Sequence, residues 1–597
     1  MRSTEAIAQP AARRPERSEG TRPKKYSKPF YFCLMHNEEI IRSFYLIIEG
    51  LEILEENPFR IKHYQNAVEK LENTHQSIFE LHQKGQLETL DLGKSITEQL
   101  KTWLNTGKWA ILEQIRNQIP EGVLNMLKLK GIGAKKVAFL WKELNITSIE
   151  ALKKACLENK IKNVKGFGEK TQENILQSIK LLEVYQSKVR YNIAHAYMEE
   201  IIQTMQKCPY IDKIEPTKEL RRKMETISTL SFIASTNAQA PLEIWLEKHF
   251  AGQKDIYLST PYYWKGTYQN MPIEFFWVSS SAFAKKQFLL TGSAQHVLHF
   301  WSDVVSSSPQ SEIEIYEKAG LPYIIPELRE DIHAPKTPQE WYKLNEVIDL
   351  EHLRGTIHNH STYSDGRNTL EEMAQTAKEV WKWEYLVIAD HSKSSAFYAN
   401  GMYENKVKEQ WQAIDNWNAK NSDFYIFKGI ECDILSDGSL DYEDDFRSGF
   451  EVVIASVHHN LNMDKGKATE RLLKAIMHPH TNLLGHITGR LLLVREGYPI
   501  DYEAVIDACA TYNVAIELNA NPYRLDLDWR WLPYAVKKGV WISINPDAHS
   551  IKGYQDTIFG VYAARKGGLL RSQTLNALSL REFKDWLRVQ HEKRSSA

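Results

Sequence analysis

Short apolar runs in the C-terminal half of this chain repeatedly lead to a side chain of the kind that binds metals. The run "YLVIADHS" leads to His391, "FYIFKGIEC" to Glu431 and "FEVVIASVHH" to His458. Helical patterns fill most of the intervals, for example residues 370–380 and 469–477. Repeated strand-then-helix units predict a parallel sheet. About seven such units predict a β/α barrel, in which the C-terminal ends of the strands converge on one mouth.

The strand ends supply nine candidate ligands. In "TIHNHSTYSD" the two histidines alternate along an extended chain, so their imidazoles share a face, and an aspartate follows after a turn. Two histidines near one aspartate recur by chance, but nine nitrogen and oxygen ligands on one rim exceed what a single zinc takes. We therefore expect two or three divalent cations. Mixed imidazole and carboxylate ligation favours manganese, zinc or iron over magnesium alone. The nine are His358, His360, Asp365, His391, Glu431, His458, His486, Asp547 and His549.

Two related segments upstream, "LKLKGIGAKKVAFLWKEL" and "IKNVKGFGEKTQENILQSI", share the pattern of a helix, a Gly-x-Gly turn and a helix that begins with lysine. Glycine permits the tight turn, and the N–H groups at a helix N-terminus favour a phosphate. One such turn is an ordinary helix–helix connection, whereas two in tandem with lysines predict a helix-hairpin-helix pair. This pair would bind DNA phosphates without sequence specificity. The DNA-binding candidates are Gly131, Gly133, Lys135, Lys136, Gly166, Gly168 and Lys170.

Length and composition limit the class of protein. A chain of 597 residues exceeds one hydrophobic core, which favours three or four domains. The chain is 43% hydrophobic, and no apolar run reaches the roughly 20 residues that cross a bilayer, so we expect no membrane partner. The five scattered cysteines, without a C-x-x-C pair, favour a reducing compartment, here the cytoplasm. The formal net charge of −1 does not exclude nucleic acid, because basic residues concentrate toward the N-terminal part. No pattern indicates an oligomeric state.

From about residue 354 to 579 the chain resembles a PHP (polymerase and histidinol phosphatase) domain. All nine metal-ligand positions of that motif set are filled by the residues given above. The resemblance implies that these nine are both the metal ligands and the catalytic residues. The stretch "ELNANPYRLDLDWR" is also typical of the family, and it suggests that Arg524 contacts the substrate phosphate. One departure is Ile487, where relatives usually carry proline, but this position is not a ligand.

After residue 35, nearly the whole chain resembles the bacterial PolX family. The resemblance implies a multidomain protein with all-α helix-hairpin-helix domains, an α+β nucleotidyltransferase-like palm and a distorted β/α barrel. The segments that carry it include "NPFRIKHYQNA", "ELRRKMET", "TGS" and "GLPYIIPELRE". An alternative for the start of the chain is translation from Met35. The expected domains are a disordered basic tail at 1–35, a helical N-terminal domain of family X type at 36–115, tandem helix-hairpin-helix motifs at 116–185, the palm at 186–335 and the PHP domain at 336–597.

The palm departs from the family at its chemistry. Family X polymerases hold two metals with an Asp-x-Asp on one strand and a third aspartate on a neighbouring strand. The aligned positions here are Thr229, Ser231 and Glu274. Two neutral hydroxyls supply no charge for magnesium, and Lys218 and Glu219 replace the Gly-Ser that usually cradles the phosphates. The resemblance therefore predicts a degenerate polymerase site. Arg221 and Arg222 remain, and we expect that they can hold DNA.

Together with these patterns, the resemblance implies a DNA-binding, metal-dependent phosphodiesterase, specifically a 3′-to-5′ exonuclease in DNA repair, without DNA polymerase activity. A PHP phosphomonoesterase that acts on a small substrate is an alternative, although tandem hairpins weigh against it. A catalytically silent DNA-binding scaffold is a second alternative, against which the nine intact ligands argue. An active family X polymerase is a third, and the palm residues argue against it.

Overall fold

The computed structural model describes residues 37–72, 78–129, 131–250, 263–305, 308–333, 338–343 and 346–596. The predicted disordered tail, residues 1–35, lies outside these residues. Contacts divide the described chain into two compact units. A helical unit comprises the described residues up to Leu124 together with Gly133–Asn145, and a large unit comprises Asn125–Ile132 together with the described residues from Ile146 onward. None of the described helices is both long enough and apolar enough to span a membrane.

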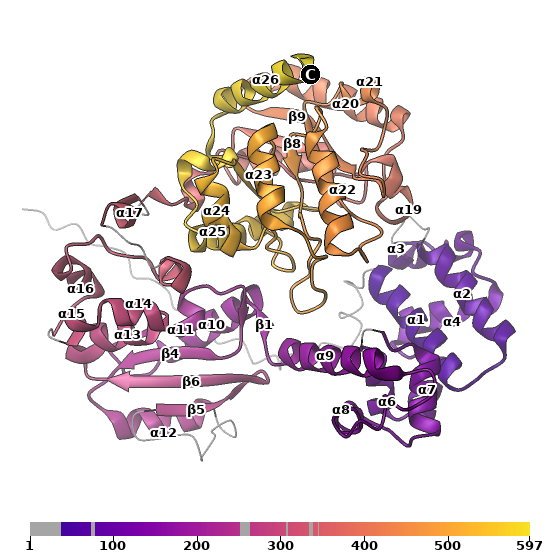
Figure 1. Cartoon of the computed structure of the whole chain (residues 1–597), viewed down its shortest axis with the longest axis horizontal. Helices are drawn as coiled ribbons and strands as arrows, with labels where there is room; N and C mark the ends of the chain where they lie inside the picture. The colour runs from indigo at the N-terminus through magenta and orange to yellow at the C-terminus, as the bar shows by residue number, and fades with distance from the viewer. Residues whose placement is uncertain are drawn as a thin grey trace, which may run out of the picture. The chain divides into compact units, whose positions relative to one another are not determined.

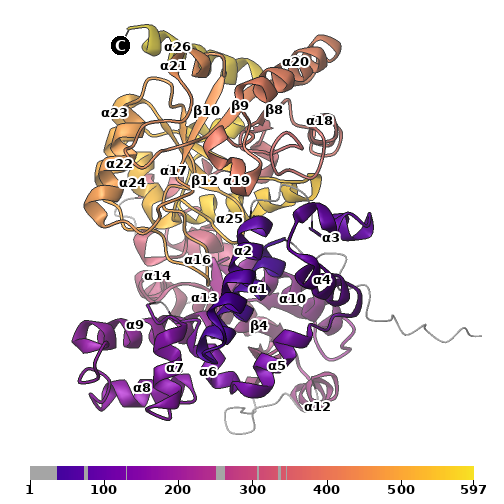
Figure 2. The ribbon, with the colours of Figure 1, turned by 90° about the vertical axis from the view of Figure 1, so that its right-hand side faces the viewer.

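The helical unit is organised around its first helix, whose buried face carries Ile40, Phe44 and Leu51. Phe44 meets the indole of Trp109 edge-on, with ring centroids 4.8 Å apart. This packing is the geometry that aromatic pairs prefer, and it joins α1 to the start of α5. Figure 2 shows α1 with α2 beside it. The helices are α1 (Asn37–Ile53), α2 (Pro58–Glu72), α3 (Ile78–Gln83), α4 (Lys94–Thr106), α5 (Ala110–Gln118) and α7 (Ala134–Lys142), and α6 (Glu121–Met126) ends in the large unit.

In the large unit, an α+β domain precedes the barrel. Its four-stranded sheet has the order β2-β4-β6-β5, with β4 parallel to β6 and the other pairs antiparallel. Phe232 and Phe275 stack on neighbouring strands and bury the sheet's centre. The strands are β1 (Val189–Arg190), β2 (Lys213–Pro216), β3 (Thr226–Ile227), β4 (Leu230–Ser235), β5 (Tyr263–Tyr268) and β6 (Met271–Val278). Strands β1 and β3 pair with each other in a separate, two-stranded antiparallel sheet. The helices of the large unit before the barrel are α8 (Ile149–Leu157) and α9 (Gly168–Gln186), which precede the sheet, and α10 (Tyr191–Met205), α11 (Lys218–Arg221), α12 (Gln239–His249), α13 (Phe283–Thr291), α14 (Ala294–His299), α15 (Trp301–Val305), α16 (Glu312–Lys318) and α17 (Pro338–Lys343).

The C-terminal domain is a seven-stranded parallel sheet in which each strand pairs with the next along the chain. Its first and last strands approach each other beyond their ends, where Asn359 bridges Ala548 in parallel and the His360 N–H donates to the Ala548 carbonyl at 2.9 Å. The sheet therefore closes nearly into a barrel, which confirms the predicted distorted β/α barrel. The strands are β7 (Gly355–Thr356), β8 (Tyr385–Ile388), β9 (Tyr425–Asp433), β10 (Val452–Ser456), β11 (Leu483–Leu484), β12 (Ala515–Asn519) and β13 (Ile542–Asn545).

Helices cover the outside of the barrel, as the intervals between strands predicted. Strands β8, β10, β12 and β13 are buried along their whole length, as expected of parallel strands with both faces covered. Figure 1 shows α22 and α23 side by side on this outer layer. The helices are α18 (Leu370–Glu379), α19 (Ala396–Ala399), α20 (Glu404–Lys420), α21 (Asp444–Arg447), α22 (Lys465–Met477), α23 (Tyr502–Tyr512), α24 (Leu532–Lys537), α25 (Thr557–Lys566) and α26 (Leu580–Ser596).

Candidate metal centre

All nine predicted ligands lie at one mouth of the barrel, at or beyond the C-terminal ends of its strands. His358 and His360 follow β7, while His391 follows β8 and Glu431 lies within β9. The remaining side chains come from the ends of β10, β11 and β13 and from the loop after β7. Because parallel strands end at the same edge, side chains as far apart in sequence as His358 and His549 meet there.

Glu431 is the centre of the arrangement and is almost fully buried. Its Oε2 lies 3.3 Å from His358 Nε2 and 3.0 Å from His391 Nδ1. Its Oε1 lies 3.0 Å from His458 Nε2 and 2.8 Å from His486 Nε2. The two oxygens of one carboxylate thus face two different sets of histidines, so Glu431 would be able to contribute to more than one cation if cations bind here.

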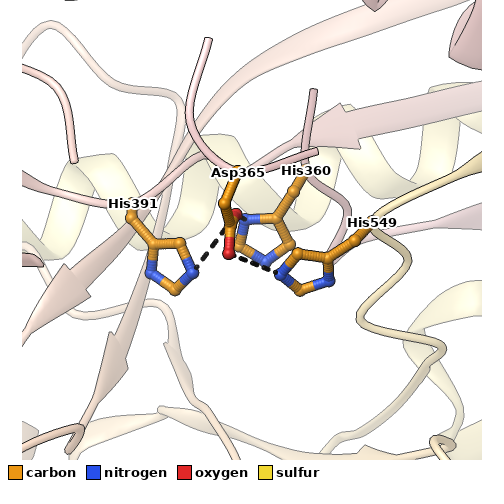
Figure 3. A group of neighbouring side chains, drawn as sticks. All are labelled: His360, Asp365, His391 and His549. Atoms are coloured by element: carbon orange, nitrogen blue, oxygen red, sulfur yellow. Dashed lines mark ion pairs between the residues drawn. The ribbon is translucent and has the colours of Figure 1, made fainter. Parts of the chain in front are cut away.

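Three groups of ligand atoms lie close enough together to hold an ion: His360, Asp365, His391 and His549; His358, His360 and Asp547; His391, Glu431 and His458. Figure 3 shows the first group, with Asp365 between the histidines. The Asp365 carboxylate lies 3.3 Å from His549 Nε2 and 3.7 Å from His391 Nε2. Of the three groups, this one is the most exposed, with the side chains of His549 and Asp365 about one third accessible.

Two backbone features place the aspartates. Gly366 allows the chain to turn back after Asp365, since a Cβ at that position would lie 2.6 Å from the His360 carbonyl oxygen. Asp547 adopts φ +53°, the left-handed region that aspartate tolerates better than most residues. Its Oδ1 lies 3.0 Å from His360 Nε2. Local strain of this kind is often retained at functional sites.

Several buried imidazole nitrogens make no hydrogen bond within the described chain: His358 Nε2, His360 Nδ1 and His391 Nδ1. Buried polar atoms almost always have a partner, so nitrogens that face a carboxylate without bonding to it fit ligands of a cation. Burial lowers the pKa of His391 to about 3 despite the nearby carboxylates, which leaves its lone pair available. Burial also opposes the charge on His458, but Glu431 and Asp433 outweigh it and raise its pKa to about 10. The carboxylates around His458 therefore favour its charged form, whereas burial keeps His391 neutral.

The sequence reasoning missed the side chains that orient the ligands. Glu517 on β12 is fully buried and lies 2.7 Å from His358 Nδ1, and it also accepts the His486 N–H at 2.7 Å. Asp433 lies 2.6 Å from His458 Nδ1. Carboxylates in this position fix the tautomer of a ligating histidine and raise its basicity. A signal existed, since Asp433 ends β9 and Glu517 lies within β12, but sequence alone does not separate a ligand from its support.

Arg524 lies in the loop after β12, with its Nε 3.9 Å from Asp547 Oδ2 and its side chain largely buried. Arg490 donates from Nε to the Arg524 carbonyl at 2.8 Å and forms an ion pair with Asp528, and both contacts hold the loop after β12 in place. A guanidinium at this place is directed at the metal centre, where it can meet an anionic substrate.

Both predicted Gly-x-Gly turns lie directly before helices. Gly131 has φ +86° and Gly133 precedes α7, whereas Gly166 and Gly168 have φ +90° and +64° and α9 begins at Gly168. A Cβ at any of the four would meet no atom within 4 Å, so the glycines are required by backbone conformation at three positions and are not required by crowding. Lys135 and Lys136 lie in the first turn of α7, and Lys170 lies in the first turn of α9.

The three predicted palm positions lie on or directly before two neighbouring strands of the sheet. Ser231 on β4 is the register partner of Glu274 on β6, and Thr229 immediately precedes β4. The Glu274 carboxylate accepts hydrogen bonds from Ser231 Oγ at 2.5 Å and Tyr263 Oη at 2.8 Å. Lys218 Nζ lies 2.6 Å from the same carboxylate, and its φ of +50° is the left-handed conformation that suits glycine.

The expectation that Arg221 and Arg222 can hold DNA is wrong. Arg221 forms a two-pronged ion pair with Glu312 at 2.6 and 3.0 Å, and Arg222 pairs with Glu330 at 2.7 Å. Both guanidinium groups are nearly buried, and charge-assisted bonds of this kind are strong. Sequence shows the two cations but not the glutamates that neutralise them about 90 to 110 positions later.

Two family models match the chain. One, described as a SAM-like helix-hairpin-helix tandem, matches residues 123–181. The other, described as a PHP domain, matches residues 356–521. Together with the barrel and its clustered ligands, the second match defines the class of the C-terminal domain, a metal-dependent PHP domain.

The chain is 34% identical over 583 residues to the DNA polymerase/3′-5′ exonuclease PolX of Bacillus subtilis (strain 168), an alignment that covers 93% of this chain and 100% of that relative. It therefore belongs to the bacterial PolX family. It is also 32% identical over 133 residues to a probable phosphatase of Aliivibrio fischeri, covering 21% of this chain and 51% of the relative. A probable phosphatase of Caldicellulosiruptor saccharolyticus is 29% identical over 191 residues, covering 30% of this chain and 74% of that relative.

Proposed function

We propose that this protein is a DNA-binding, metal-dependent phosphodiesterase that acts as a 3′-to-5′ exonuclease in DNA repair. The observation that carries the proposal is the barrel mouth, where three groups of ligand atoms lie together. The first group shares His360 with the second and His391 with the third, and the Glu431 carboxylate contacts histidines of all three. Tandem hairpins on the same chain supply a means to hold DNA. The printed name of the Bacillus subtilis relative, which includes a 3′-5′ exonuclease, supports the same activity. Its membership of the PolX family favours a cytoplasmic location, with DNA as partner.

The nine side chains at the mouth are the proposed ligands of two or three divalent cations. His360 and His391 each belong to two groups, but a neutral imidazole offers only one lone pair, so each can bind in only one of its two groups. The number of bound ions depends on which group each histidine joins. His486 lies outside the three groups but contacts the same Glu431 oxygen as His458, so the two histidines would hold the same ion. The mixture of imidazole and carboxylate favours manganese, zinc or iron.

The chain's own residues bind and orient the substrate. Cations bound here supply Lewis acidity and a water of lowered pKa. Arg524, which reaches toward Asp547, neutralises a phosphoryl oxygen and fixes its direction. Glu517 and Asp433 hold His358 and His458 in one orientation, so that the site needs little rearrangement during the reaction. No described side chain has to act as a separate general base.

A metal reconstitution experiment tests this function. Purified full-length protein, stripped and then reloaded with manganese, zinc or iron, should contain two to three ions per chain by elemental analysis. It should shorten 3′ ends of DNA labelled at the 5′ end, one nucleotide at a time. The stripped protein should not. Less than one ion per chain after reloading, or digestion that persists without metal, would contradict the proposal.

The second candidate is a phosphomonoesterase that acts on a small substrate. The matches to probable phosphatases favour it. The same digestion experiment separates the two, because a phosphomonoesterase releases inorganic phosphate from a 3′-phosphorylated oligonucleotide but leaves the chain length unchanged.

We also propose that the domain boundaries predicted above, 1–35, 36–115, 116–185, 186–335 and 336–597, describe the functional parts. The two family matches fall inside the third and fifth of these ranges. The first range rests on composition and the second on the sequence resemblance.

DNA binding should depend on the hairpin turns and be independent of sequence. The double variant Lys135→Glu with Lys170→Glu replaces two exposed lysines beside the turns, so it should weaken binding of a random-sequence duplex at least about tenfold and make its salt dependence less steep. Fluorescence anisotropy across a salt series measures both. Lys467→Glu, on an exposed side chain of α22, is the matched control and should bind like the unmodified protein. Equal affinities for the double variant and the control would place the DNA contact elsewhere.

We propose that the palm has lost polymerase activity. Magnesium that carries a triphosphate needs several anionic oxygens, whereas Glu274 is the sole carboxylate among the three aligned positions, and it is engaged by Lys218 and Ser231. The Lys218 ammonium stands where a cation would otherwise bind. The α+β domain then serves as a scaffold, and its arginines support this role because they pair with glutamates of the same domain.

A further inference from the structure

The α+β domain and the barrel meet at a packed seam that begins just after β1. Tyr191 is buried and meets the rings of Phe559 and Tyr562 on α25 edge-on, with centroids 6.4 and 5.9 Å apart. Lys566 at the end of α25 is also buried, and it donates to the Arg222 carbonyl at 3.0 Å. Close packing on both sides fixes the backbone here. Arg190, which directly precedes Tyr191, is therefore held in one place relative to the barrel.

Arg190 carries a charge that the described chain does not compensate. Its guanidinium lies over the Tyr523 ring, 3.6 Å from the centroid. Its Nε is buried without a hydrogen bond, and no carboxylate among the described residues lies within ion-pair distance of it. Arg530, at the same seam, instead pairs with Glu225 at 2.8 Å. A partly buried cation without an anion costs free energy, which an anion from outside the chain would offset.

The residue under Arg190 belongs to the loop that leads to the metal centre. Tyr523 directly precedes Arg524, whose Nε lies 3.9 Å from the ligand Asp547. The Leu492 N–H donates to the Tyr523 carbonyl at 2.5 Å, so the loop after β12 is tied to the loop after β11. Arg495 on that second loop has its pKa lowered by burial and by the like charge of Arg524. Positive charge from two domains thus gathers beside one side of the barrel mouth.

We propose that Arg190 binds the phosphate of the nucleotide next to the one that is cleaved, and so makes the barrel select polynucleotides over small phosphate esters. This inference rests on the proposed phosphodiesterase function. A small ester has a single phosphate, which the metal ligands and Arg524 take, and it offers nothing to Arg190. A polynucleotide presents a second phosphate along its backbone. The α+β domain thereby contributes a substrate contact to a reaction that takes place in the barrel.

The test compares two substrates on metal-loaded, full-length protein: a single-stranded oligonucleotide and bis(4-nitrophenyl) phosphate. In Arg190→Gln, the ratio of kcat/KM for the oligonucleotide to kcat/KM for the small diester should fall about tenfold or more, the size expected for one charge-assisted contact. Arg190→Lys keeps the charge but loses the planar group that stacks on Tyr523, so its ratio should lie between that of the unmodified protein and that of Arg190→Gln. Arg530→Gln removes a paired arginine from the same seam and should keep the unmodified ratio.

A second measurement does not depend on turnover. Binding of a cleavage-resistant phosphorothioate oligonucleotide is followed against salt, and the slope of log affinity should be shallower by about 0.7 in Arg190→Gln, the value for one lost phosphate contact on a single strand. An unchanged slope, or parallel losses of activity on both substrates, would show that Arg190 only supports the seam. If the unmodified protein cleaves neither substrate, the proposed function fails, and the slope alone decides whether Arg190 contacts the phosphate.

Discussion

Replacing His360 with alanine is expected to remove nuclease activity, by at least about 10³-fold. His360 takes part in two of the three ligand groups, so its loss damages the binding of more than one cation. The loss should exceed the roughly 10- to 100-fold that follows from removing a residue that only orients a ligand. DNA binding should persist, because the hairpin turns lie in another part of the chain. Digestion of end-labelled DNA, elemental analysis and anisotropy measure the three properties.

Glu517→Gln provides the graded comparison for His360→Ala. The amide keeps the shape of the side chain at β12 but no longer carries the charge that faces His358. Activity should fall by about 10- to 100-fold and should recover partly at higher metal concentration, because outer partners act mainly on metal affinity. A digestion rate that stays normal in His360→Ala would indicate a contaminating nuclease or a different active site.

Primer extension by this protein should be undetectable. Loss of preorganised charge typically costs a few kcal/mol of barrier per group, and both hydroxyl-for-carboxylate replacements, at Thr229 and Ser231, contribute. The assay uses the nuclease-dead His360→Ala background, so that degradation cannot mask synthesis. Extension at about 1 nucleotide per second or faster, a rate typical of enzymes, would contradict the proposed loss of polymerase activity.

Restoring the polymerase carboxylates tests the alignment. Aspartates at positions 229, 231 and 274 rebuild the charge, but the Lys218 ammonium, now 2.6 Å from Glu274, still competes with a metal ion. We therefore expect the triple substitution alone to remain weak and the further change Lys218→Gly to increase extension. Glycine also suits the positive φ at that position. If Lys218→Gly has no effect on the restored protein, the lysine does not block the site.

The fold of the barrel was predictable because its signal is local. Each strand is a short apolar run and each helix a periodic segment, so the pattern of residues 356 to 549 already indicates parallel strands and their shared edge. The helix-hairpin-helix family match has the same origin, since its turns depend on glycines within a few positions of the helices they precede.

The palm could be predicted only in part. The predicted positions Ser231 and Glu274 are register partners on neighbouring strands. Their environment was not predictable, because Lys218 reaches Glu274 from a position 56 residues earlier. The same limit explains the error at Arg221, whose partner Glu312 is 91 residues away in sequence.

By itself, the sequence determined which strand ends carry imidazoles and carboxylates, because the order of the chain in a β/α barrel fixes which residues reach the mouth. Only the tertiary structure decided how they are used. It placed Glu431 between two sets of histidines and put Glu517 within hydrogen-bond distance of His358, and it set Arg190 over Tyr523 with no ion-pair partner among the described residues. These relations depend on distances of a few ångströms between residues far apart in sequence. Electrostatic energy changes steeply over such distances, and no local pattern of residues encodes them.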